Sequence, residues 1–183
     1  MIVSDMNEAQ LIGKDIKWDW TGSVFRPHWK LTYEGRTVAS LFWKKTSLFT
    51  GHFEGSYDSM PVRIDYDKKS DVATFTNTDD GQIIGTLTGI REYLKSDYPK
   101  KDGVFINSNG DGYSLMFDEA LRGHVFINKS GALLGMTVII YRNTPNRSFR
   151  LLTDDIGLMN PWLIALIGHY WAINALGTDF TPA

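Results

Sequence analysis

The 183-residue sequence contains no cysteine, which excludes disulfide bonds, thiolate metal sites and a secreted disulfide scaffold. It also lacks a large excess of either charge: 19 Lys and Arg face 21 Asp and Glu, and the formal net charge is −2. This balance argues against a general nucleic-acid or anionic-membrane binder, although it leaves room for a local basic patch. The N-terminus has no basic region followed by an apolar run, so we predict no secretory signal and expect a cytoplasmic location.

The motifs of the common enzyme classes are missing as well. The sequence contains no G-x-S-x-G elbow, no P-loop and no G-x-G-x-x-G. Its histidines lie far apart and show no metal-ligand spacing: His28, His52, His124 and His169. We therefore predict a non-catalytic protein without a cofactor. Because barrels build sites from residues on distant strands, an enzyme or small-molecule binder that uses a cleft is the alternative.

What the sequence does contain is a long series of short, strand-like segments separated by turn residues. Apolar and polar residues alternate in many of them, and "EGR" (34–36) and "DKKSD" (67–71) have the chemistry of hairpin turns. Thr21-Gly22 is also interpreted as a turn, and 88–102 as a strand end followed by a polar loop or short helix. The series predicts roughly twelve strands of an all-β barrel or sandwich. The segments are 14–20, 23–26, 29–33, 37–43, 48–54, 61–66, 72–76, 82–90, 103–107, 113–117, 123–128, 132–141 and 148–152.

The last part of the chain, "NPWLIALIGHYWAINALG" (160–177), predicts a helix instead. Asn160 is a good N-cap, Pro161 suits the first helical position, and Gly177 is a natural stop. Apolar residues occur on every side of the helical wheel, so no side is suited to water. Small residues form one stripe along the helix: Ala165, Gly168, Ala172 and Ala175.

A helix that is apolar all round is either a membrane span or the centre of a protein core. A span is disfavoured because 161–176 would be about 24 Å long, short of the ~30 Å hydrocarbon layer. His169 and Asn174 would lie in lipid, and no Lys or Arg follows Arg150 to anchor the segment. The sequence therefore favours a buried helix and not an integral membrane protein.

These features together predict one domain over 1–183, mainly β, in which a closed antiparallel barrel surrounds a helix at about 160–176. The small-residue stripe should face the closest part of the wall, and Trp162, Tyr170 and Trp171 should fill the wider side. His169 and Asn174 are each predicted to hydrogen-bond a strand backbone or side chain, since buried polar groups are normally satisfied.

Three stretches resemble the tubby-like superfamily, which includes the LURP-one-related proteins and the phospholipid scramblases. They are "IKWDWTGSVFRPHWKLTYEGRTVASLFWKKTSLFTGHFEG" (16–55), with its Phe-Arg-Pro turn, "ATFTNTDDGQIIGTLTG" (73–89) and the terminal "NPWLIALIGHYWAINAL" (160–176). The resemblance covers patterns of strand, turn and helix and contains no catalytic fingerprint. It implies a closed barrel of about twelve strands around a hydrophobic C-terminal helix.

The resemblance also implies a binding role. Tubby proteins bind phosphoinositide head groups through basic residues on the barrel surface, and scramblases add membrane and calcium-binding segments. Lys44, Lys45 and Arg36 are the candidate phosphate contacts here, and solvated strand ends are the alternative interpretation. We therefore expect a non-catalytic binding or scaffold domain whose partner is a phospholipid head group or a protein, with no nucleic-acid partner. A membrane-associated, scramblase-like protein is a further alternative.

One segment, "NSNGDGYSLMFD" (107–118), follows the order of side chains in a calcium loop. Asn107, Asn109, Asp111 and Asp118 would occupy ligand positions one, three, five and twelve. The pattern departs from the motif because Asp replaces the bidentate Glu and strand-like sequence flanks the loop. A β-turn made with Asn, Gly and Asp between two strands is the alternative.

Overall fold

The structure is a computed structural model that describes residues 8–23, 26–46, 51–90, 102–118, 120–121, 123–142, 144–157 and 159–175. Within these ranges the chain forms the short helix η1 (Glu8–Gln10), twelve strands and the helix α2 (Pro161–Ala175). The strands are β1 (Ile16–Ser23), β2 (Arg26–Tyr33), β3 (Arg36–Lys45), β4 (Gly51–Tyr57), β5 (Met60–Asp67), β6 (Val72–Asn77), β7 (Ile83–Thr88), β8 (Gly103–Asn107), β9 (Gly112–Asp118), β10 (Gly123–Asn128), β11 (Leu133–Arg142) and β12 (Thr144–Leu151).

The strands form a closed antiparallel barrel in which each strand pairs with its neighbours in sequence. The ring closes where Ile16, Lys17 and Trp18 of β1 pair with β12. Closure leaves the sheet without the two open edges that an unclosed sheet would expose. The predicted fold class, a mainly β barrel with one C-terminal helix, is therefore confirmed.

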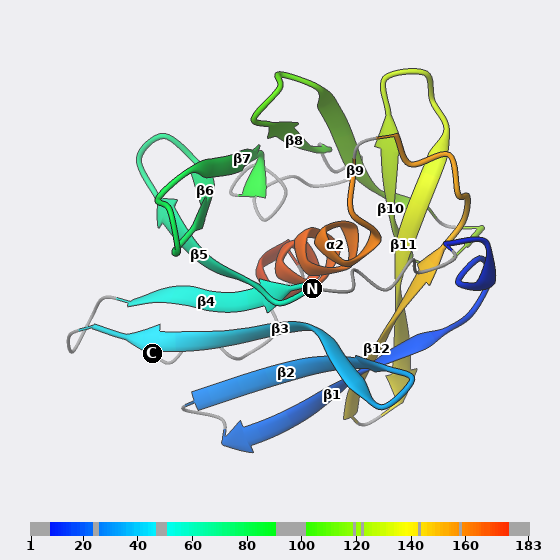
Figure 1. Cartoon of the computed structure of the whole chain (residues 1–183), viewed down its shortest axis with the longest axis horizontal. Helices are drawn as coiled ribbons and strands as arrows, with labels where there is room; N and C mark the ends of the chain where they lie inside the picture. The colour runs from blue at the N-terminus through cyan, green and yellow to red at the C-terminus, as the bar shows by residue number, and fades with distance from the viewer. Residues whose placement is uncertain are drawn as a thin grey trace.

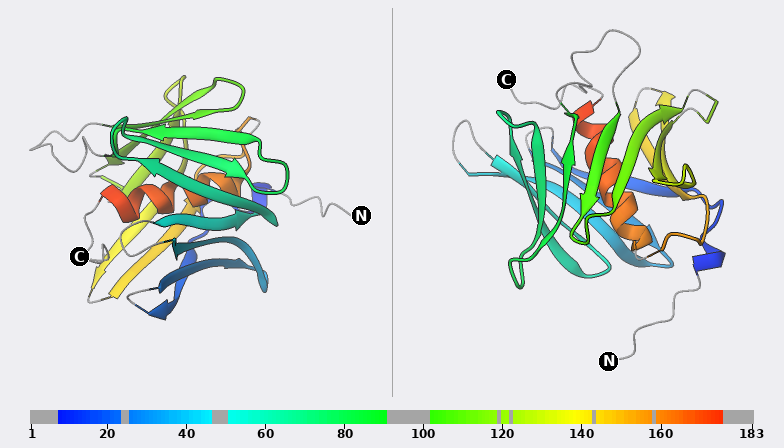
Figure 2. Two further views of the ribbon diagram at one scale, coloured as in Figure 1. Left: turned by 90° about the vertical axis from the view of Figure 1, so that its left-hand side faces the viewer. Right: turned by 90° about the horizontal axis from the view of Figure 1, so that it is seen from above.

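The helix α2 lies inside the ring of strands, as Figure 1 and the two views of Figure 2 show. Asn160 caps its start: the Asn160 Oδ1 accepts a hydrogen bond from the Trp162 N–H at 2.8 Å, and Pro161 is the first helical residue. Every residue from Pro161 to Ile173 is buried. Neither helix that the structure describes has the length and hydropathy needed to cross a membrane. The predicted stop at Gly177 lies outside the described residues.

At Gly168 and Tyr170, small and large side chains divide the space around α2 as predicted. A Cβ on Gly168 would lie 2.6 Å from the Thr137 Oγ1, so the helix backbone almost touches β11 there. On the other side, the Tyr170 ring packs edge-on against Phe53 and Phe75. Full burial of one large apolar side chain stabilises the fold by about 1.5–3 kcal/mol, so these contacts hold the helix firmly against the surrounding strands.

The start of the barrel differs from the prediction. Thr21-Gly22 is not a turn, because β1 continues through it to Ser23. The predicted strand 23–26 is not observed as one unit: Ser23 ends β1, Arg26 begins β2, and the two residues between them lie outside the described residues. Gly22 pairs with Pro27, and a Cβ on Gly22 would collide with the Arg26 carbonyl oxygen. The glycine therefore marks a close approach of two strands, which the sequence alone does not distinguish from a turn. The predicted turn at 34–36 is confirmed, since Glu34 and Gly35 both have positive φ between β2 and β3.

Gly168→Leu should overpack the contact between α2 and β11 and lower the free energy of unfolding by roughly 1–3 kcal/mol or more. Thermal or denaturant unfolding would measure the loss. Gly112→Ala is the matched control, because a Cβ there would meet only the Lys129 Cε, at 3.7 Å. Equal stability of the Gly168→Leu variant and the wild type would contradict the burial of this helix face.

Candidate functional site

The predicted phosphate contacts lie at opposite ends of one strand. Arg36 is the first residue of β3, and Lys44 and Lys45 are the last two. At about 3.3 Å per residue, Arg36 lies about 26 Å from Lys44 along the strand. The structure therefore does not bring Arg36 together with the two lysines.

Lys44 is held by an ion pair on the outside of the barrel. Its Nζ lies 2.8 Å from the Glu54 Oε1, and that same oxygen lies 2.8 Å from the His52 Nε2. Burial alone would raise the pKa of Glu54, but the hydrogen bonds from Lys44 and His52 outweigh burial and lower it. Glu54 is thus a carboxylate at neutral pH and offsets the charge of Lys44. Within the described part of the chain, Lys45 is exposed and has no ion-pair partner.

A surface pocket of about 270 Å³ lies beside this end of β3. We call it the rim pocket, and its lining residues are Arg26, Pro27, His28, Phe42 and Trp43. The pairing of β2 with β3 ends at His28 and Phe42, although β2 continues along β1 and β3 continues along β4. Pro27 lies at the parting of the strands and has no N–H to extend the ladder. The pocket therefore occupies the place where the two strands separate.

The rim pocket combines a cation with aromatic surface. Arg26 is exposed, and no ion pair to it occurs among the described residues. His28 meets the Phe42 ring edge-on, with ring centroids 5.4 Å apart. Burial, and secondarily the charge of Lys30, lowers the pKa of His28, so its imidazole is neutral at pH 7. Trp43 packs edge-on against Phe53 at 5.0 Å, which fixes its indole.

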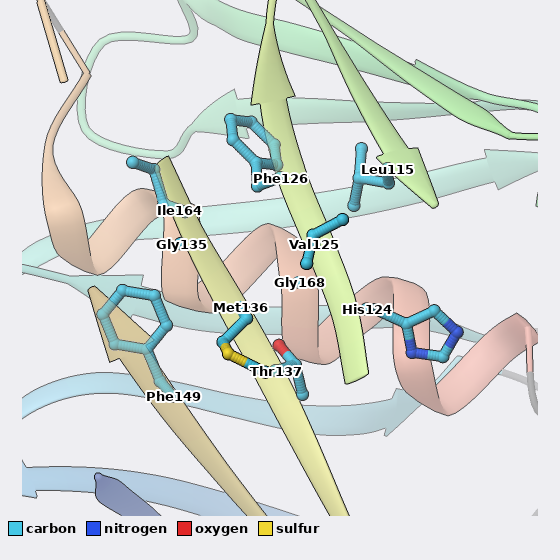
Figure 3. Close-up of a pocket in the computed structure, with 10 residues that line it drawn as sticks. All are labelled: Leu115, His124, Val125, Phe126, Gly135, Met136, Thr137, Phe149, Ile164 and Gly168. Carbon is cyan, nitrogen blue, oxygen red and sulfur yellow. The ribbon is translucent and has the colours of Figure 1, made fainter. Parts of the chain in front are cut away.

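Among the described residues, the interior of the barrel is filled by the buried helix α2. A cavity of about 10 Å³ lies between α2 and the strands β9, β10, β11 and β12, where Gly168 and Thr137 meet (Figure 3). That volume holds one water molecule at most. A ligand larger than water therefore has no room there.

His169 and Asn174 do not make the predicted contacts. His169 is 0% exposed, and neither ring nitrogen has a hydrogen-bond partner among the described residues. Its ring instead stacks on Trp18 at 4.1 Å and meets Trp29 edge-on at 5.4 Å. Asn174 bonds its own helix, donating from Nδ2 to the Tyr170 carbonyl at 2.8 Å. Both predictions of a bond to a strand were wrong, because aromatic packing and the helix backbone take the place of strand partners.

Burial, together with the charge of Arg147, lowers the pKa of His169 well below its usual value. The neutral imidazole is therefore the form that the folded barrel accepts. With no exposed atom and a filled core around it, His169 cannot reach a substrate and serves packing.

The calcium-loop candidates do not converge. Asn107 and Asp111 flank the turn between β8 and β9, whereas Asp118 ends β9, about 20 Å further along the strand. The Asp118 Oδ1 accepts the Leu121 N–H at 2.8 Å in the next turn. Within the described ranges, no group of three or more His, Asp or Glu side chains is placed to hold a metal ion.

The residues of the candidate loop form a hairpin turn, the alternative that the sequence left open. The Asn107 Oδ1 accepts the N–H groups of Asn109 and Asp111 at 3.0 and 2.8 Å. Asn128 makes the same two bonds, to Ser130 and Ala132, between β10 and β11. That second turn has no carboxylate, so the shared geometry is explained by turn formation and needs no ion.

Asn107→Ala and Asn128→Ala should each lower the free energy of unfolding by about 1–2 kcal/mol, because each leaves two turn N–H groups without their acceptor. Thermal unfolding with calcium chloride or with a chelator should give the same Tm for the wild type. A calcium-dependent rise in Tm that the Asn107→Ala variant loses would restore the ion-binding interpretation.

Stability should also depend on pH through His169. Its pKa is about 6.5 when unfolded and is lower when folded, so below pH 6.5 the unfolded chain binds more protons. Stabilisation from this residue is thus complete above pH 6.5 and falls by up to about 1.4 kcal/mol per pH unit as the pH decreases. His169→Phe keeps the ring packing and should remove this component. If the free energy of unfolding fell equally with pH in the variant and the wild type between pH 7 and 5, His169 would not be the source of the pH dependence.

Comparisons with family models, with curated proteins and with solved structures found no match.

Proposed function

We propose that this protein is a non-catalytic binding domain of the tubby-like type, which meets its ligand or partner with the outer wall of the barrel. The observation that carries the proposal is the filled interior. Barrels that transport small molecules hold them in a central cavity, whereas here α2 occupies the centre with every residue from Pro161 to Ile173 buried, and the cavity beside Gly168 measures only about 10 Å³. Binding is thus assigned to the outside.

The end of the barrel at which β2 begins and β3 ends favours an anionic partner. Arg26, Lys44 and Lys45 lie there, and Lys30 is two residues from the rim pocket. The resemblance to tubby proteins suggests a phospholipid head group as this partner. Each lysine near an anionic membrane contributes about 1 kcal/mol, and the ion pair of Lys44 with Glu54 reduces its share. Head-group binding by this surface should therefore be weak and electrostatic.

Flotation with phosphoinositide-containing liposomes tests this proposal. We expect measurable retention at low salt and little at physiological salt. At physiological ionic strength, the attraction between exposed charges more than about 8 Å apart is largely screened. Lys44→Ala/Lys45→Ala should abolish the low-salt retention. Arg36→Ala is the matched control at the other end of β3 and should behave as the wild type.

Two outcomes would contradict the proposal that Lys44 and Lys45 bind phospholipid head groups. One is an absence of retention even at low salt. The other is retention that the double variant keeps. Strong retention in high salt that the double variant loses would instead make lipid binding a tight, specific function and contradict its electrostatic character.

A further inference from the structure

We propose that the rim pocket binds a small organic anion, a molecule that carries a phosphate or carboxylate on a flat apolar ring. The inference rests on the proposed function in one respect, that ligands bind outside the filled barrel. It needs neither a membrane nor the two lysines of β3.

The space suits a small molecule. The rim pocket measures about 270 Å³, close to the lower end of the 300–1,000 Å³ typical of small-molecule sites. It is formed by the backbone, since the β2–β3 ladder stops at His28 and Phe42 while both strands stay paired on their other sides. Such a gap is present before any ligand arrives.

The charge in the pocket selects an anion. Arg26 supplies a guanidinium, which can bind two oxygens of a phosphate or carboxylate side by side. None of the five described residues that line the pocket is acidic. Glu54 pairs across from Phe42 on the neighbouring strand, and Lys44 and His52 already engage its carboxylate. The positive charge of Arg26 is therefore available to a ligand.

The backbone that carries Arg26 is fixed. Arg26 pairs with Ser23, and Pro27 with Gly22, so two rungs of the β1–β2 ladder position this end of β2. The absence of a side chain on Gly22 lets the strands approach, because a Cβ would collide with the Arg26 carbonyl oxygen. A site on paired strands holds its side chains more accurately than a site on a loop.

The aromatic residues select a flat ring. Phe42 and Trp43 are half-buried, and each is braced by a second ring: Phe42 by His28, and Trp43 by Phe53. Their remaining surface offers offset or edge-to-face contact to an aromatic ligand. Because His28 is neutral at pH 7, its imidazole can donate one hydrogen bond without adding a second fixed charge. Cation, donor and ring surfaces thus lie around one pocket.

Phenyl phosphate is the test probe, with inorganic phosphate and phenol as its two halves. Titrations followed by ¹H–¹⁵N NMR should show binding of phenyl phosphate tighter than that of either half, with shifts at His28 and at the Trp43 indole. Arg26→Gln should weaken phenyl phosphate about tenfold or more, because a charge-assisted pair is lost. Phe42→Leu should reduce the affinity toward that of inorganic phosphate.

Arg36→Gln is the control arginine on β3 and should leave the affinity unchanged. Lys44→Ala/Lys45→Ala should also bind phenyl phosphate normally even where vesicle retention is lost, which separates this inference from the proposed function. Unfolding curves of each variant establish that the fold is intact. The inference is overturned if Arg26→Gln binds as the wild type does, if inorganic phosphate binds as tightly as phenyl phosphate, or if the shifts cluster around Arg36.

Discussion

A helix without a polar face can exist in water only inside a complete coat of other residues, and this requirement shapes the whole molecule. Thirteen consecutive residues of α2, Pro161–Ile173, are buried, so no sector of the helix can be left to solvent. An open sheet would cover one side only. The strands therefore have to close into a ring, and the three pairs between β1 and β12 complete it. The helix can be buried on all sides only if the barrel closes, so closure and burial depend on each other.

Under the proposed function, the same constraint confines ligand binding to the outer surface. A barrel whose interior is packed with side chains has no room for a ligand, and the cavity beside Gly168 accommodates a water molecule at most. A concave surface then has to arise where the pairing of neighbouring strands in the barrel wall is interrupted. The pairing of β2 with β3 is interrupted in this way beyond His28, and cationic and aromatic side chains surround the gap. The rim pocket is thus a consequence of how the ladder ends.

The sequence predicted the fold well where the signal was local. The helix at about 160–176 is observed as Pro161–Ala175, because an N-cap, a proline and an unbroken apolar run coincide there. The alternation within strands located the wall for the same reason. The wheel also identified Gly168 as facing a close wall, since small residues recur on one side of the helix. These features depend on neighbours within a few positions of the chain.

Features that depend on register were not predictable in this way. "FRP" was interpreted as a turn; Phe25 lies outside the described residues, whereas Arg26 and Pro27 pair with β1 but not with β3 and line the rim pocket. Asn107 and Asp118 matched a calcium pattern because they are eleven positions apart in sequence, whereas the extended course of β9 separates them in space. Arg36 and Lys44 share one strand, and its length keeps them apart. Spacing along a chain indicates proximity only after the local geometry is known.

The burial of His169 links the core to the rim. An imidazole with two unbonded nitrogens costs about 1–3 kcal/mol in a core, and the stacked Trp18 and the edge-on Trp29 provide the compensating contacts. Trp29 is buried while Lys30 is exposed, as expected for a strand whose side chains alternate between core and solvent. Its neighbour on the other side, His28, lines the rim pocket. The packing that holds Trp29 against His169 therefore also fixes the backbone from which His28 projects. A rigid interior, even one that contains a costly polar group, gives the outer site a defined shape before a ligand binds.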